Sequence, residues 1–200
     1  MSPRRRASVW SQGVDALRNT TTPDTIDPVI TANDIVALVR LAAEPGEWTF
    51  RSLGAELGMD PAAVHRSIGR LGEAKLLGAD RLPNRGKIEE FLVHGLPYLI
   101  PAEPGPLVRG IPTAWGAPPL EGLLAKSDEP APVWPDPKGA SRGPEVEPIA
   151  EVVPRLAREQ PELGEWFALI DGIRVGRARE RKLAAQELRE RIWAQAGVPA

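Results

Sequence analysis

TFRSLGAELGMDPAAVHRSIGRLGEAKLL, residues 49–77, predicts two short helices joined by a tight turn. Thr49 is a residue type that caps helix N-termini, and two leucines four residues apart give the first helix one apolar face. Gly58 ends that helix. Asp60 and Pro61 begin the next one, because aspartate caps helices and proline suits the first helical position.

The second helix has two faces of different character. Val64, Ile68 and Leu71 recur at intervals of four and three residues, so they define the face that turns toward the core. The other face carries small residues early and arginines in the middle, which suits insertion of a helix end into the major groove of DNA. The candidate DNA contacts on this helix are Ala62, Ala63, His65, Arg66 and Arg70.

The pattern formed by these two helices extends to the residues that follow them. Its positions are filled by Leu53, Leu57, Gly58, Met59, Val64, Arg66, Ile68, Leu71, Leu76 and Leu77. The chain here resembles winged helix-turn-helix transcriptional regulators of the MarR-like kind, over roughly residues 31–112. The resemblance implies that the second helix reads bases and that a β-hairpin wing contacts the DNA backbone. It also brings Arg51 and Ser52, at the start of the first helix of the pair, into the candidate DNA-binding set.

Two segments precede the helix pair. Thr31 predicts the N-cap of a helix that runs to Ala43, with Asp34 in the first turn, where its charge suits the helix dipole. Residues 1–27 open with three consecutive arginines, at positions 4–6. This segment is either a basic arm that lies along DNA or a solvated tail.

The position of the wing has two solutions in the sequence. Residues 85–94 read as a helix, capped by Asn84 and ended by Gly95, so the wing is either the loop 78–87 or a hairpin within 97–112. The first solution makes Arg81, Arg85 and Lys87 the backbone contacts, and the second makes Arg109 the contact. The first set carries more charge and is favoured.

Residues 113–148 contain eight prolines, which exclude long regular elements. We expect an irregular strap that packs on the core through Val133 and Trp134, with one short helix over 120–126. The segments IPAEPGPLVRG and VWPDPKGASRG resemble each other, either as a repeated anion-binding turn or, as we favour, through shared turn chemistry.

The C-terminal region, residues 149–200, predicts one long helix from Pro161 to about Gln195. Its first half has a dense apolar face with aromatic residues, and its second half is charged in the manner of a solvated helix. The apolar face would either dimerise or hold a protein partner.

Composition excludes several classes of function. There is no cysteine, and His65 and His94 are the two histidines, which excludes disulfides, thiolate metal sites and a histidine-rich metal site. Catalytic motifs are absent and the carboxylates are scattered, so neither an enzyme nor a cofactor is expected. Net charge is −2, so DNA binding must come from a local basic patch. No apolar run is long enough for a membrane span and no signal peptide is present, which favours a cytoplasmic location.

The sequence therefore predicts a mainly α fold with a small β-hairpin, in which a winged helix-turn-helix core at 28–112 is followed by an irregular segment and a long C-terminal helix. The function expected is that of a site-specific DNA-binding transcriptional regulator, a repressor that binds double-stranded DNA as a homodimer. Its composition is typical of a GC-rich bacterial genome. The alternative is an antitoxin or protein-docking module, whose winged helix autoregulates while the C-terminal region binds a protein partner.

Overall fold

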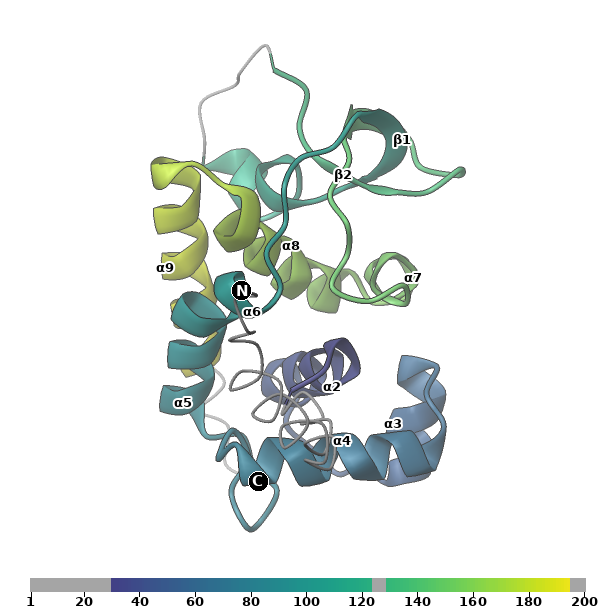
Figure 1. Cartoon of the computed structure of the whole chain (residues 1–200), viewed down its shortest axis with the longest axis vertical. Helices are drawn as coiled ribbons and strands as arrows, with labels where there is room; N and C mark the ends of the chain where they lie inside the picture. The colour runs from purple at the N-terminus through teal and green to yellow at the C-terminus, as the bar shows by residue number, and fades with distance from the viewer. Residues whose placement is uncertain (1–29, 124–128, 195–200) are drawn as a thin grey trace, which may run out of the picture.

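The structure is a computed structural model that describes residues 30–123 and 129–194. Over these residues the chain is mainly helical, with one small antiparallel sheet of three strands (Figure 1). The expectation of a mainly α fold is confirmed at this level. The N-terminal arm expected over 1–27 lies outside the described residues.

The first three described helices have the bounds that their capping residues predict. They are α2 (Ala32–Ala43), α3 (Phe50–Leu57) and α4 (Pro61–Glu73). Thr31 and Thr49 each form a capping box at the start of a helix, and the Asp60 carboxylate accepts the backbone N–H of Ala62 at 2.8 Å. These side chains satisfy N–H groups that a helix start leaves without partners.

Two glycines make the turn between α3 and α4 tight. Gly58 has φ +67° and ψ 31°, the left-handed conformation in which a Cβ is unfavourable. A Cβ added to Gly54 would lie 2.6 Å from the carbonyl oxygen of Met59, which is a steric clash. A residue with a side chain therefore does not fit at this position. The Met59 N–H in turn donates to the Gly54 oxygen at 2.8 Å. The angle between the two helices therefore depends on Gly54 and Gly58.

A small hairpin follows α4, and we call it the 76–84 hairpin. Leu77 and Pro83 form an antiparallel bridge, and the Gly78 N–H donates to the Leu82 oxygen at 2.9 Å. Figure 1 shows this loop projecting at one end of the molecule, next to α4. Of the two hairpin positions expected from the sequence, the structure has the earlier one.

The later hairpin, expected within 97–112, is wrong in its first half. The helix α5 (Arg85–Glu90) continues through a π-helical turn, η1 (Phe91–Gly95), into α6 (Leu96–Leu99). Asn84 caps α5 as expected, but Gly95 keeps a right-handed backbone, φ −88° and ψ −45°, and does not end the helix. Because Leu92, Val93 and Leu96 are buried, tertiary packing maintains the helix across Gly95.

The sheet is formed by three short strands, β1 (Leu107–Pro112), β2 (Val133–Pro135) and β3 (Ser141–Pro144), in the order β2-β1-β3. Ile111 pairs with Trp134 on one side of β1, and Arg109 pairs with Arg142 on the other. Two of the three strands thus come from the proline-rich segment that was expected to be irregular.

The rest of that segment is closer to expectation. It adds short 3-10 turns, η2 (Ala114–Gly116) and η3 (Leu120–Gly122). The short helix expected over 120–126 is described only for its first residues. Val133 and Trp134 are buried, as expected.

The C-terminal region is three helices, α7 (Val153–Glu159), α8 (Pro161–Val175) and α9 (Ala178–Ala194). The prediction of one long helix from Pro161 is wrong, because α8 ends at Gly176, whose backbone is extended. The chain then turns, and α9 packs against α8. Most residues of α8 are buried, so other elements must cover it on all sides, and α9 supplies part of this cover by packing back against it.

One hydrophobic cluster joins residues from α2 to α9. Within it lies a polar group of α8, Asp171, which accepts hydrogen bonds from Thr113 at 2.9 Å, Trp134 Nε1 at 2.6 Å and Arg174 at 2.6 Å. Burial raises the pKa of Asp171, although all three donors favour its charged form. These bonds join α8 to η2 and to the sheet. The described parts of the regions 28–112, 113–148 and 149–200 therefore contribute to a shared core.

Candidate nucleic-acid interface

The α4 helix buries one face and exposes the other. Val64, Ile68 and Leu71 are buried, as their spacing predicts. The exposed face carries Ala62, His65, Arg66, Gly69 and Glu73, with Ala63 half-buried at its edge. Over the described residues, Arg66 forms no hydrogen bond or ion pair, so its guanidinium is free to meet a ligand.

An aromatic cluster connects α3, α4 and the 76–84 hairpin. The Phe50 ring lies 5.0 Å from His65 and 5.7 Å from Trp48, centroid to centroid, in edge-on arrangements. The Arg81 guanidinium lies over the same ring at 5.2 Å, a cation–π geometry. Both His65 and Arg81 therefore contact the Phe50 ring, which brings the exposed face of α4 and the 76–84 hairpin together. Sequence reasoning missed this cluster, although the closely spaced aromatic residues at 48 and 50 were a signal for it.

A cleft of about 490 Å³ lies between α4 and the 76–84 hairpin. Gly69 and Gly72 form its α4 side, where added Cβ atoms would meet nothing, and Lys75 and Arg81 also line it. Both cationic residues have positive φ, 61° and 64°, a conformation that non-glycine residues rarely adopt. Backbone strain of this kind concentrates at functional sites. The sequence did not single out Lys75.

Arg70 does not belong to the exposed basic set. Its Nε and Nη2 donate to the two carboxylate oxygens of Asp34 on α2, each at 2.7 Å, and Asp34 is fully buried. Burial acts to raise the pKa of Asp34, but the bonds from Arg70 and Thr31 outweigh it, and the pKa lies below its usual value. This ion pair fixes α4 on α2, and a contact of Arg70 with DNA stays a prediction.

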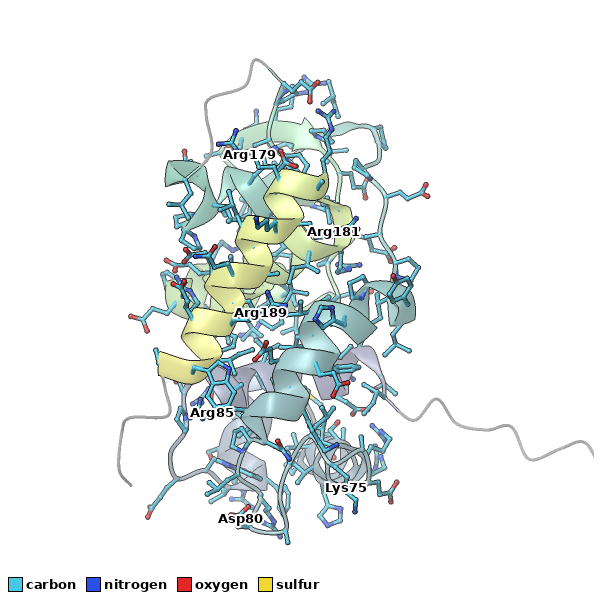
Figure 2. All side chains as sticks on the ribbon, turned by 90° about the vertical axis from the view of Figure 1, so that its left-hand side faces the viewer. Lys75, Asp80, Arg85, Arg179, Arg181 and Arg189 are labelled. Carbon is cyan, nitrogen blue, oxygen red and sulfur yellow. The ribbon has the colours of Figure 1, made fainter. Side chains whose placement is uncertain are left out.

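Three further candidates are also held by contacts within the chain. Arg85 donates to the carbonyl oxygen of Ile192, near the end of α9, and Figure 2 shows it beside that helix. The Ser52 hydroxyl is engaged in the capping box of α3. Arg109 donates to the Gly139 oxygen at 3.1 Å and lies on β1, at the opposite end of the molecule from α4 (Figure 1).

The basic residues that stay near α4 without an ion pair in the described residues are Arg51, Arg66, Lys75, Arg81 and Lys87. Figure 2 places Lys75 and the hairpin residue Asp80 at one end of the molecule, and Arg179 toward the other end. Between residues 47 and 87 there are seven lysines and arginines against five acidic residues, in a chain whose net charge is −2. The local balance is thus opposite in sign to that of the whole chain.

The described part of the chain was also compared with the requirements of a metal site and of a membrane-spanning helix. No group of three or more His, Asp and Glu side chains is placed to hold a metal ion there. A search of the same residues for a helix long and apolar enough to cross a membrane gives none. Comparison with protein-family models, with curated proteins and with solved structures gives no match for the chain.

Proposed function

We propose that this protein binds double-stranded DNA at specific sites and acts as a transcriptional regulator, a cytoplasmic repressor of the winged helix-turn-helix type. The observation that carries the proposal is the face of α4 that exposes His65, Arg66 and Gly69 beside the 76–84 hairpin. In this assignment α3 and α4 form the helix-turn-helix, and the hairpin is the wing.

The dimensions of α4 fit the proposed partner. Thirteen helical residues extend about 20 Å, and the major groove of B-DNA admits one α-helix. Ala62 and Ala63 near the N-terminus let the backbone approach the base edges closely. Arg66 lies one turn further on, where a guanidinium can donate two hydrogen bonds to a guanine.

The remaining cations suit contacts with the DNA backbone. Arg51 is at the start of α3, Arg81 is in the hairpin and Lys87 is in α5, and these elements lie toward opposite ends of α4 (Figure 1). Phosphate contacts position a protein on the duplex without specifying its sequence. A protein with few such contacts and a net negative charge depends on its base contacts for affinity at physiological salt.

Burial of α8 weighs against the protein-docking alternative. That alternative assigned the aromatic face at 161–173 to a partner, but Trp166 and Phe167 are buried in the core of the chain itself. A homodimer, which we include in the proposal, would place a second α4 on a second half-site. Dimerisation through the C-terminal region would have to use the outer face of α9, where Trp193 is 52% exposed.

Selection of binding sites from random duplex DNA tests the proposal. The full chain is used at about 150 mM salt, because low salt strengthens nonspecific binding. We expect one enriched motif, and we expect Arg66→Ala to weaken binding to it by about 1–3 kcal/mol. Arg66→Lys should lose most of the same affinity, since lysine lacks the bidentate geometry.

The matched control is Arg179→Ala, which removes an exposed arginine at the far end of the molecule. It should leave affinity for the motif unchanged. Failure to enrich any motif would refute the proposal, and an Arg66→Ala variant with full affinity would remove α4 as the reading helix.

A further inference from the structure

A cleft with a volume of about 760 Å³ lies between the sheet and the helices α7 and α8. Its surfaces are mostly carbon: Ile111 and Val133 from the sheet, Ala157 and Gly164 from the helices, and the half-buried indole of Trp115. This volume is within the range of sites for small organic molecules, and a flat aromatic wall favours a ligand with an apolar, aromatic body.

The arginine that lines this cleft from the sheet has a second arginine as its neighbour across the strands. Arg109 and Arg142 are directly opposite in the β1–β3 register, and Arg142 lines the cleft. Like charges in this position repel. Neither forms an ion pair with any described residue, and Asp136 on the neighbouring turn is already paired with Arg158 at 3.0 Å. A bound anion would relieve the repulsion.

The acidic residues that line the cleft do not cancel this charge. Glu129 pairs with Arg177 at 3.2 Å, and Glu165 pairs with Arg191, so both carboxylates are already neutralised. Glu121 is exposed on η3 at the opening, where water screens its charge. The cation that faces the cleft without an ion pair among the described residues is that of Arg142.

We propose that this cleft binds an organic anion, a carboxylate or sulfonate on an aromatic body, with the anionic group on Arg142 and the body against Trp115. The site goes beyond the proposed DNA-binding function and does not depend on it: the cleft lies between the sheet and α7 and α8, whereas DNA binding is assigned to α3, α4 and the 76–84 hairpin.

Two fluorescent probes of nearly the same shape test the charge requirement on the full chain. They are 8-anilinonaphthalene-1-sulfonate, which is anionic, and N-phenyl-1-naphthylamine, which lacks the sulfonate. We expect saturable binding of the anionic probe, weakened at least about tenfold by Arg142→Gln because a charge-assisted contact is lost. The neutral probe should bind the same variant as it binds the wild type.

Two further variants complete the test. Trp115→Ala should weaken both probes, because it removes the aromatic wall. Lys138→Gln, which removes an exposed cation of the β2–β3 turn outside the cleft, should weaken neither. Equal effects of Arg142→Gln on the two probes, or none on the anionic one, would overturn the proposal. Arg142 is exposed, so its variant is expected to fold, and circular dichroism checks this.

Discussion

The ion pair between Asp34 and Arg70 gives the sharpest test of how α4 is held. Removing one partner of a fully buried pair costs about 3–5 kcal/mol, because the other charge stays buried without compensation. Asp34 is fully buried, but the Arg70 side chain is 29% exposed, so water lowers the cost. We therefore expect Arg70→Met to reduce the free energy of unfolding by about 2–3 kcal/mol.

A double-mutant cycle separates this pair from other effects of the substitutions. Asp34→Asn keeps an oxygen that can accept the Thr31 N–H and leaves Arg70 able to turn toward water, so it should cost about 1–2 kcal/mol. The double variant buries no unpaired charge. It should be no less stable than Arg70→Met alone, which corresponds to a coupling of about 1–2 kcal/mol.

Urea unfolding near pH 7, followed by far-UV circular dichroism, measures all four proteins. Arg179→Met is the control for loss of an exposed arginine, and we expect it to lie within about 0.5 kcal/mol of the wild type. Additive losses in the double variant would refute the pairing. An Arg70→Met variant of wild-type stability that has lost affinity for the selected DNA would return Arg70 to the DNA-binding face.

Three further results are expected. Gly58→Ala should lower the free energy of unfolding by about 1–2 kcal/mol, measured by urea unfolding, because its φ of +67° disfavours a Cβ; an unchanged midpoint would contradict this. Arg174→Met should cost about 3–5 kcal/mol in the same assay, since it leaves Asp171 buried without its cation, and a loss below about 1 kcal/mol would show that the pair is not buried in solution. Because the pKa of Asp34 is lowered on folding, its stabilising contribution is present above the unfolded value, about 3.9, and is lost as pH falls through the folded value. The wild type should thus lose more stability than Asp34→Asn on acidification from about pH 6 to pH 3, and parallel curves would argue against this linkage.

Local signals in the sequence were sufficient for the helices α2, α3 and α4. Thr31, Thr49 and Asp60 cap helices with their own side chains, and Gly58 ends one through its own backbone, so these boundaries depend on residues within one turn of each other. The burial of Val64, Ile68 and Leu71 likewise follows from spacing alone. Helix boundaries and buried faces of this kind can be predicted from sequence because the residues that determine them are close together in the chain.

The later elements depend on partners distant in the chain. The residues near Gly95 and Gly176 do not indicate whether the helix continues or ends there. The helix continues through Gly95 because Leu96 packs in the core. The helix α8 ends before Gly176 because α9 turns back and packs against α8. The strands β2 and β3 form in a proline-rich segment because β1 lies between them and supplies their backbone partners.

For the candidate interface the same division holds. The sequence by itself determined that α4 has one exposed face with Arg66 on it, because helical periodicity separates the two faces. Tertiary structure alone decided that Arg70, one turn further on, pairs with Asp34, and that Arg85 and Arg109 are held elsewhere. The physical reason is that an arginine side chain is long and pairs with an acceptor only where one lies within its reach, and distant segments bring such acceptors near it only when they pack together.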